Sequence, residues 1–281
     1  MKTHMTSRFS EKIGFMQGRL SEQSEGRIQS FPWGNWKDEF VLGGSIGFKL
    51  LEWTIDSTGS GTNPLIDRHG ISEIKELIGQ TKVHVNSVTS DWFMENPPWS
   101  GRLSNCVQMH HIICESLNSI GASILVIPLV DNSNISNKSD EKQFEFFIEN
   151  LSAILFEKKI SVAIESDFAP LKLKQFISRF DKEIVGINYD IGNSAHLGYN
   201  PYEEFDYYGD RIINVHVKDR KLGGPTTQLG KGDANFEVVF DRLKKISYDG
   251  NYILQTARAS ERESHSEVLE RYASMVEEWI G

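Results

Sequence analysis

Four short apolar segments in the second half of the chain each end in a side chain that can bind a metal ion. These side chains are Glu165, Asp190, His216 and Gln255. Two carboxylates, an imidazole and an amide oxygen suit a divalent ion such as Mn, Co, Zn or Mg. A bound ion of this kind polarises a carbonyl and stabilises negative charge on oxygen. The four residues therefore predict metal-assisted chemistry, provided that the fold brings them together.

Each of these residues also has an ordinary structural explanation. A strand-end carboxylate such as Glu165 often caps the following helix, and Asp190 in "NYDIGNS" could shape a turn. His216 alone would more often be a core histidine, and Gln255 alone carries almost no information. The signal is their joint placement at the ends of successive segments.

These segments belong to a repeating pattern of strand, polar turn and helix. Apolar residues recur at helical spacing between the strands, most clearly in 144–155 and 238–246. The expected strands are Ile13–Gln17, Lys49–Ile55, Val83–Thr89, Ser123–Val130, Ser161–Ser166, Val185–Ile191, Ile212–Lys218 and Asn251–Thr256. Eight such units predict an α/β fold of the (β/α)₈ TIM-barrel type, with residues 1–281 as a single domain.

A doubly wound open sheet is the competing fold. It usually carries a Gly-rich phosphate turn after its first strand, and the segment Met16-Gln17-Gly18-Arg19-Leu20 has no such fingerprint. In a barrel, functional residues gather at the carboxyl ends of the strands. If strands five to eight share a common register, all four candidate ligands point into the same barrel mouth.

Composition limits the partners. A net charge of −9 argues against a nucleic-acid partner, because phosphate binding draws on a positive surface. No apolar run is long enough to span a membrane, and the first residues lack the apolar region of a signal peptide. Cys106 and Cys114 lie about 12 Å apart along an expected helix, too far for a disulfide. These features predict a cytoplasmic protein. Barrels of this kind are often dimers or tetramers, so a homo-oligomer stays open.

Several motifs resemble those of a known family. They are "IGFMQGRL", "LLEWTID", "VAIES", "YDIGNSAHLG", "VHVKD" and "GKGDANFEVVF", and they extend over nearly the whole chain. The chain resembles the sugar phosphate isomerase/epimerase family with the xylose-isomerase-like barrel, a group that also includes endonuclease IV. The resemblance implies that Glu165, Asp190 and His216 hold a divalent metal, with Gln255 at the fourth ligand position.

The fourth position departs from the family pattern. In the family's ketose 3-epimerases two glutamates bind the metal and also exchange protons with opposite faces of the substrate, whereas the Gln255 amide is not basic. The leading hypothesis is a sugar or sugar-phosphate isomerase or epimerase that removes a proton next to a carbonyl through an enediolate, with Glu165 as base. A second proton donor would come from His216, Lys218 or His196.

The predicted substrate contacts follow strand ends. Arg19, Lys218 and Arg258 could hold a phosphate or carboxylate, and Glu52 could accept hydroxyl protons. Asn193 could bind a sugar hydroxyl or simply form a turn. The expected partner is therefore a small sugar or sugar phosphate.

Other interpretations remain open from the sequence. The loop 222–232 could supply backbone N–H groups to an anion or could simply be flexible, and Asp91 and Trp92 could cover the barrel mouth. The main alternative function is a non-catalytic barrel that binds a sugar-like ligand and has lost its second glutamate. A less favoured one is an endonuclease IV-like metal-dependent hydrolase, which the acidic net charge opposes.

Overall fold

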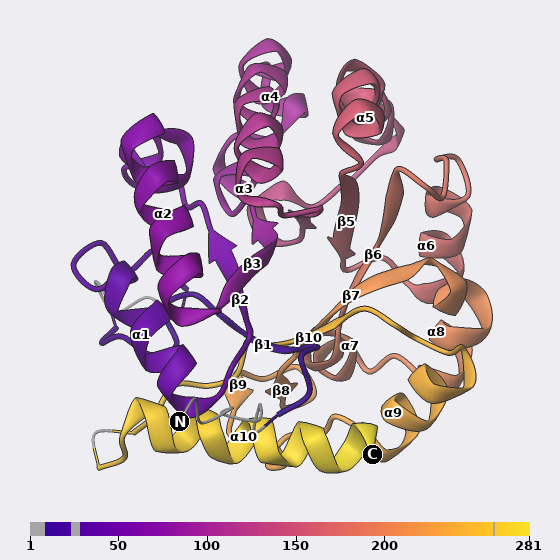
Figure 1. Ribbon diagram of the computed structural model, residues 1–281. Helices are drawn as coiled ribbons and strands as arrows, with labels where there is room; N and C mark the ends of the chain where they lie inside the picture. The colour runs from indigo at the N-terminus through magenta and orange to yellow at the C-terminus, as the bar shows by residue number, and fades with distance from the viewer. Residues whose placement is uncertain (1–8, 24–28, 261) are drawn as a thin grey trace.

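The computed structural model describes residues 9–23, 29–260 and 262–281, and within them eight parallel strands close into a barrel (Figure 1). The order around the barrel is β1-β10-β7-β6-β5-β4-β3-β2, and pairing of Ile13 with Tyr252 closes it between β1 and β10. The strands are β1 (Ile13–Met16), β2 (Leu50–Thr54), β3 (His84–Thr89), β4 (Ile124–Leu129), β5 (Ser161–Ser166), β6 (Val185–Asp190), β7 (Ile212–Val217) and β10 (Asn251–Leu254). The predicted TIM barrel is confirmed, and closure excludes the open sheet.

Helices surround the strands on the outside of the barrel (Figure 1). The longer ones are α1 (Trp36–Ile46), α2 (Arg68–Thr81), α4 (Leu103–Ile120), α5 (Lys138–Lys158), α6 (Pro170–Ile177), α8 (Pro201–Tyr208), α9 (Phe236–Lys245) and α10 (His265–Ile280). Two short helices, α3 (Trp92–Glu95) and α7 (Ile191–Leu197), follow β3 and β6 directly. A small hairpin of β8 (Asp219–Arg220) and β9 (Thr226–Thr227) follows β7. These short elements stand where the barrel mouth is built.

Helix α5 shows how the sequence specifies the outer layer. Its residues Phe144, Phe147 and Leu151 repeat at helical spacing and are fully buried. Burial of each such side chain stabilises the fold by roughly 1.5–3 kcal/mol. The helix begins at Asn137, whose side chain accepts hydrogen bonds from two backbone N–H groups of the first turn. Apolar periodicity and a polar cap together fix the helix against the barrel.

The two cysteines and the hydrophobicity of the helices agree with the sequence. Cys106 and Cys114 are both buried free thiols, as their spacing predicts. No helix in the described part of the chain is long and apolar enough to cross a bilayer.

The loop after β7 is organised by a buried carboxylate. Asp219 accepts hydrogen bonds from the backbone N–H groups of Gly230 (2.9 Å), Gly232 (2.8 Å) and Ala234 (3.2 Å). The sequence left open whether loop 222–232 binds an anion. In the structure, the N–H groups of Gly230 and Gly232 are occupied by the chain's own carboxylate.

A Gly232→Ala substitution is expected to destabilise this loop. A Cβ at position 232 would lie 1.8 Å from an Asp219 carboxylate oxygen, so the loop would have to move and its hydrogen bonds would break. We expect a loss of about 1–3 kcal/mol in the free energy of unfolding, measured by urea denaturation. Gly79→Ala in α2, where a Cβ meets nothing within 4 Å, is the control and should stabilise slightly. Equal unfolding midpoints for the two variants would contradict the expectation.

Candidate metal centre and substrate cavity

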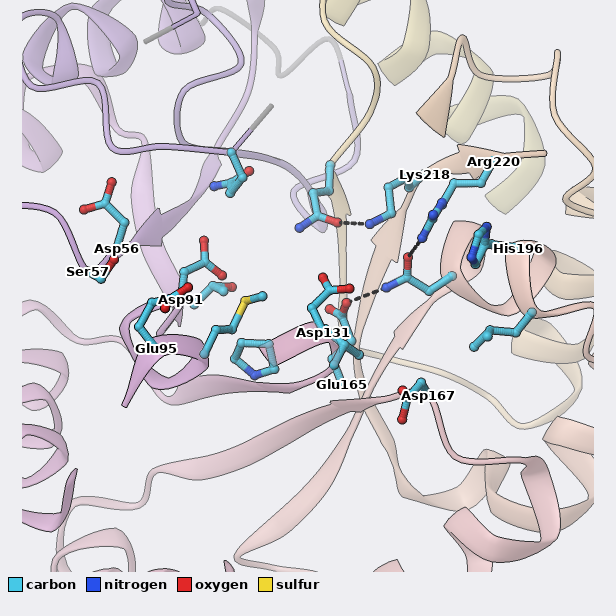
Figure 2. Close-up of a pocket in the computed structure, with 18 residues that line it drawn as sticks. Asp56, Ser57, Asp91, Glu95, Asp131, Glu165, Asp167, His196, Lys218 and Arg220 are labelled. Carbon is cyan, nitrogen blue, oxygen red and sulfur yellow. Dashed lines mark hydrogen bonds between the residues drawn. The ribbon is translucent and has the colours of Figure 1, made fainter. Parts of the chain in front are cut away.

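A cavity of about 940 Å³ opens at the carboxyl ends of the barrel strands (Figure 2). Its lining includes Glu165 from β5 and residues that follow β2, β3, β4, β6 and β7. This volume lies within the range of small-molecule sites, which is about 300–1,000 Å³. The cavity therefore has room for a ligand of sugar size.

Three of the predicted ligand residues converge where Glu165 lines this cavity. Glu165, Asp190 and His216 are buried, and each offers one ligand atom such that all three atoms lie within 4.8 Å of one another. The donor set of two carboxylates and one imidazole nitrogen fits a divalent cation. These residues form a candidate metal-binding triad.

The expected common register is wrong even though the triad forms. Asp190 does pair directly with His216. However, Ile164 pairs with Ile187, so Glu165 is not level with Asp190 along the ladder. In a closed barrel the strands tilt and are staggered, so residues at different ladder positions can meet at the axis. Convergence comes from strand tilt instead of a shared register.

The imidazole of His216 is held from both sides. Its Nε2 lies 2.6 Å from a carboxylate oxygen of Glu52. Its Nδ1 lies 3.1 Å from Glu165 and 3.0 Å from the amide nitrogen of Asn188. A metal-binding histidine usually donates its other ring N–H to a carboxylate or carbonyl, which fixes the ring and its tautomer. The Glu52 carboxylate is placed to accept the Nε2–H of His216, which leaves Nδ1 facing Glu165.

Glu52 does not occupy the place predicted for a substrate contact. Its carboxylate is fully buried and accepts hydrogen bonds from Ser87 (2.6 Å), Thr89 (2.7 Å) and Asn214 (2.9 Å), besides its contact with His216. It lies behind the imidazole, outside the described lining of the cavity. The sequence shows that Glu52 ends a strand but not that a histidine from the far side of the barrel covers it.

The charges of this cluster shift one another's pKa values. Burial alone would lower the pKa of His216, but Glu52 and Glu165 outweigh it and raise the pKa to about 10. Burial opposes ionisation of Glu52 and Glu165, yet contact with His216 lowers the pKa of both carboxyl groups. For Asp190 burial dominates and raises the pKa, although Lys218 acts in the opposite direction. Without a metal, the cluster therefore favours an imidazolium between two carboxylates.

Gln255 and Lys218 meet beside the triad. The Lys218 ammonium lies 2.7 Å from Asp190 and donates a 2.8 Å hydrogen bond to the amide oxygen of Gln255 (Figure 2). The amide oxygen of Gln255, predicted as the fourth metal ligand, thus accepts a hydrogen bond from Lys218. The predicted substrate contact Lys218 lines the cavity, and so does Gln255.

Two asparagines hold Glu165 in place. The amide of Asn188 donates to one carboxylate oxygen and the amide of Asn193 to the other, each at 2.7 Å. Asn193 also donates its backbone N–H to Asp190 and accepts a hydrogen bond from Arg220 (Figure 2). Asn193 therefore has both roles considered from the sequence, since it forms the turn and lines the cavity. Asn188, two residues before Asp190, was not among the predicted site residues.

Arg19 and Arg258 lie elsewhere than predicted. Arg19 is buried and donates to the backbone carbonyl of Thr256 at 2.9 Å, while Arg258 donates to the carbonyls of Gly18 and Ser21. Neither arginine belongs to the described lining of the large cavity, and Arg258 lines a smaller one. Both join the loop after β1 to the loop after β10. An arginine that follows a strand can point toward neighbouring loops as easily as toward the barrel mouth. The sequence does not distinguish these two directions.

A set of acidic residues that follow the strands was not predicted as a group, and of these only Asp91 was named from the sequence, as part of a cover over the barrel mouth. They share one position, one or two residues beyond the end of a strand, and they line the cavity: Asp56, Asp91, Asp131 and Asp167. Figure 2 shows Asp56 and Asp91 on one side of the cavity and Lys218, Arg220 and His196 on the other. The signal was present in the sequence as "TID", "TSD", "LVD" and "ESD". Asp167 lies toward the side of His196, so the acidic side is formed by Asp56 and Asp91 and the basic side by Lys218 and Arg220.

The closed barrel carries a candidate metal-binding triad at the carboxyl ends of its strands. Residues 44–275 match the family model of the xylose isomerase-like TIM barrel. The chain belongs to this family, which confirms the resemblance seen in its motifs.

Relatives at low identity extend this comparison. MJ1311, an uncharacterised protein of Methanocaldococcus jannaschii, is 30% identical over 115 residues, which are 40% of this chain and 39% of that protein. The putative L-ribulose-5-phosphate 3-epimerase SgbU of Haemophilus influenzae is 22% identical over 252 residues, 84% of this chain and 88% of that protein. The inosose dehydratase of Geobacillus kaustophilus is 30% identical over 118 residues, 36% of this chain and 37% of that protein.

Solved structures share the fold. The 3-keto-D-glucoside 4-epimerase YcjR of E. coli superposes with a TM-score of 0.69 at 18% identity, covering 95% of this chain and 100% of that one. The IOLI protein, whose crystal structure holds a zinc atom, superposes with a TM-score of 0.72 at 15% identity, covering 96% of this chain and 98% of that one. At these identities the likeness concerns the fold alone.

Proposed function

We propose that this protein is a metal-dependent sugar isomerase or epimerase that removes a proton from a carbon next to a carbonyl. The observation that carries the proposal is the position of Glu165, which belongs to the triad and also lines the cavity. Glu165, Asp190 and His216 would hold the ion, and Gln255 could add its amide oxygen if Lys218 moved. When bound, a divalent ion would polarise the substrate carbonyl and stabilise the enediolate.

Glu165 is the candidate base. Burial opposes ionisation of its carboxyl group, but contact with His216 lowers its pKa and keeps the group ionised. Asn188 and Asn193 fix both of its oxygens at the edge of the cavity, which orients the carboxylate toward a bound substrate. Lys218 and Arg220 also line the cavity and can offer N–H donors to substrate oxygens.

The named relatives support a reaction of this type. SgbU and YcjR are named as epimerases, and other relatives are named as inosose dehydratases. Epimerisation, isomerisation and dehydration of such compounds can all begin with loss of a proton beside a carbonyl. Dehydration is the second candidate function, and product analysis distinguishes it.

Solvent exchange tests the proposal. Protein loaded with Mn, Co, Zn or Mg is incubated in D₂O with D-allulose, D-tagatose, D-fructose, L-ribulose 5-phosphate and an inosose. We expect deuterium at one carbon beside the carbonyl of at least one compound, detected by NMR and mass spectrometry, and loss of exchange after chelation. Binding without exchange or product formation would favour the non-catalytic barrel. Zinc-dependent nicking of abasic duplex DNA without exchange would favour the endonuclease IV-like alternative.

A further inference from the structure

Asp91 lies at the junction of β3 and α3, on the acidic side of the cavity (Figure 2). Lys218 and Arg220 stand on the opposite side. A substrate placed between these walls and above Glu165 would therefore meet carboxyl groups from two different strands. Asp91 was expected from the sequence only as part of a cover over the barrel mouth.

The carboxyl group of Asp91 takes no part in the described hydrogen bonds of the fold. Asp91 stands at the N-cap position of α3, yet its side chain makes no capping hydrogen bond. In the described part of the chain it makes no side-chain hydrogen bond or ion pair. By contrast, Asp67 caps α2 through the N–H of Gly70, and Asp190 accepts from the N–H of Asn193. The usual structural role of an aspartate before a helix does not account for Asp91.

The backbone around Asp91 is well fixed. The N–H of Trp92 donates to the carbonyl of Ile55 at 2.8 Å, and the N–H of Phe93 donates to that of Ser90 at 3.1 Å. The Trp92 ring packs edge-on against His110, with centroids 5.8 Å apart. The segment is thus anchored to β2 and α4, which argues against a lid and holds the Asp91 carboxyl in one place.

The surroundings of Asp91 favour its protonated form. Burial raises its pKa to about 7, with further contributions from the carboxylates of Glu165, Asp56 and Glu52, while His216 acts in the opposite direction. Asp91 follows β3 and Glu165 belongs to β5, and both line the same cavity, so a substrate bound there can meet both carboxyl groups.

The donors considered from the sequence are engaged elsewhere. Lys218 is held between Asp190 and Gln255, and the Nδ1 of His196 lies 2.9 Å from the carbonyl of Gly224. His216 lies between Glu52 and Glu165 at the base of the site. Asp91 is therefore better placed than Lys218, His196 or His216 to donate a proton to the substrate.

We propose that Asp91 is the second proton-transfer residue of this site and delivers a proton to the substrate face opposite Glu165. The inference rests on the proposed function and specifies its substrate as a ketose that is inverted at the carbon beside its carbonyl. Glu165 takes the proton from this carbon, and the C–H electrons form the enediolate. The enediolate electrons then form a new C–H bond with the Asp91 proton on the other face. Exchange with water restores the starting protonation of both residues.

The test separates exchange from inversion. Wild type, Asp91→Asn and Glu165→Gln, each with Mn²⁺, are incubated in D₂O with D-allulose and with L-ribulose 5-phosphate. Asp91→Asn should still exchange deuterium into the recovered starting sugar, because Glu165 can remove and return a proton on one face. Its epimer formation should fall by about 10²-fold or more. Glu165→Gln should lose both.

Asp67→Asn is the matched control, since it makes the same change at an N-cap outside the described cavity lining and Asn caps equally well. It should exchange and epimerise as the wild type does.

Should Asp91→Asn fail to fold, Asp91→Glu replaces it and should retain inversion. Inversion by Asp91→Asn at the wild-type rate, or none by Asp91→Glu, would overturn the inference. A wild type that exchanges but gives a dehydrated product also overturns it. A wild type with no exchange defeats the proposed function, and this inference with it.

Discussion

Replacing Glu165 with glutamine is expected to slow deuterium exchange into the substrate by about 10²–10⁴-fold. The amide has nearly the same size but cannot accept the proton. Asn188 and Asn193 each donate to one oxygen of Glu165. In the variant, one of these asparagine N–H groups would face the N–H group of the new amide, and that hydrogen bond would be lost. The variant should therefore lose both its base and the orientation of the group that replaces it.

The same substitution removes a negative charge from the candidate triad, so weaker metal binding must be separated from lost chemistry. Manganese affinity is measured by calorimetry, and exchange is then measured at saturating metal. Glu149→Gln, an exposed change on α5, is the control and should match the wild type in both measurements. Exchange by Glu165→Gln at the wild-type rate with saturating metal would show that Glu165 is not the base.

The fold was predictable because each strand is a short apolar run followed by polar residues, and each helix repeats its apolar residues at helical spacing. Phe144 and Phe147 of α5 show this pattern clearly, and both are buried. The pattern depends only on which residues avoid water, which a single sequence displays directly. Glu165, Asp190 and His216 could be assembled for the same reason, because they end neighbouring strands.

The functions of the other polar residues depend on distances that sequence does not contain. Glu52 and His216 are 164 residues apart, and only barrel closure brings them within 2.6 Å of each other. Arg19 and Arg258 follow β1 and β10 in the sequence, but they donate to loop carbonyls and do not join the triad. Their direction follows from local packing between loops, which strand periodicity does not specify.

Replacing Glu52 with alanine is expected to reduce the free energy of unfolding of the metal-free protein by about 3–5 kcal/mol. Glu52 is completely buried and accepts from Ser87, Thr89 and Asn214, so its loss leaves several donors without an acceptor. It also removes the carboxylate that faces the His216 imidazolium. Because Glu52 fixes the ring from behind, manganese affinity should fall by about 10–100-fold as well.

The pH dependence of this destabilisation shows how much of it comes from the charge pair of Glu52 and His216. The pKa of His216 is raised to about 10, so its contribution to stability is fully present below its unfolded pKa of about 6.5 and disappears as pH rises through 10. The lowered pKa of Glu52 makes its contribution complete above about pH 4.5. The difference between wild type and Glu52→Ala should therefore be largest near pH 6 and shrink toward pH 10, as measured by urea unfolding with a chelator present.

A second buried glutamate provides the control for metal binding. Glu204 accepts hydrogen bonds from the hydroxyl groups of Tyr189, Ser194 and Tyr208 and, like Glu52, is almost completely buried. Glu204→Ala should also lose stability, because three buried donors lose their acceptor, but it should keep its manganese affinity. If both variants lost metal affinity equally, general loosening of the barrel would explain the result. A loss confined to Glu52→Ala would show that this carboxylate acts on the site through His216.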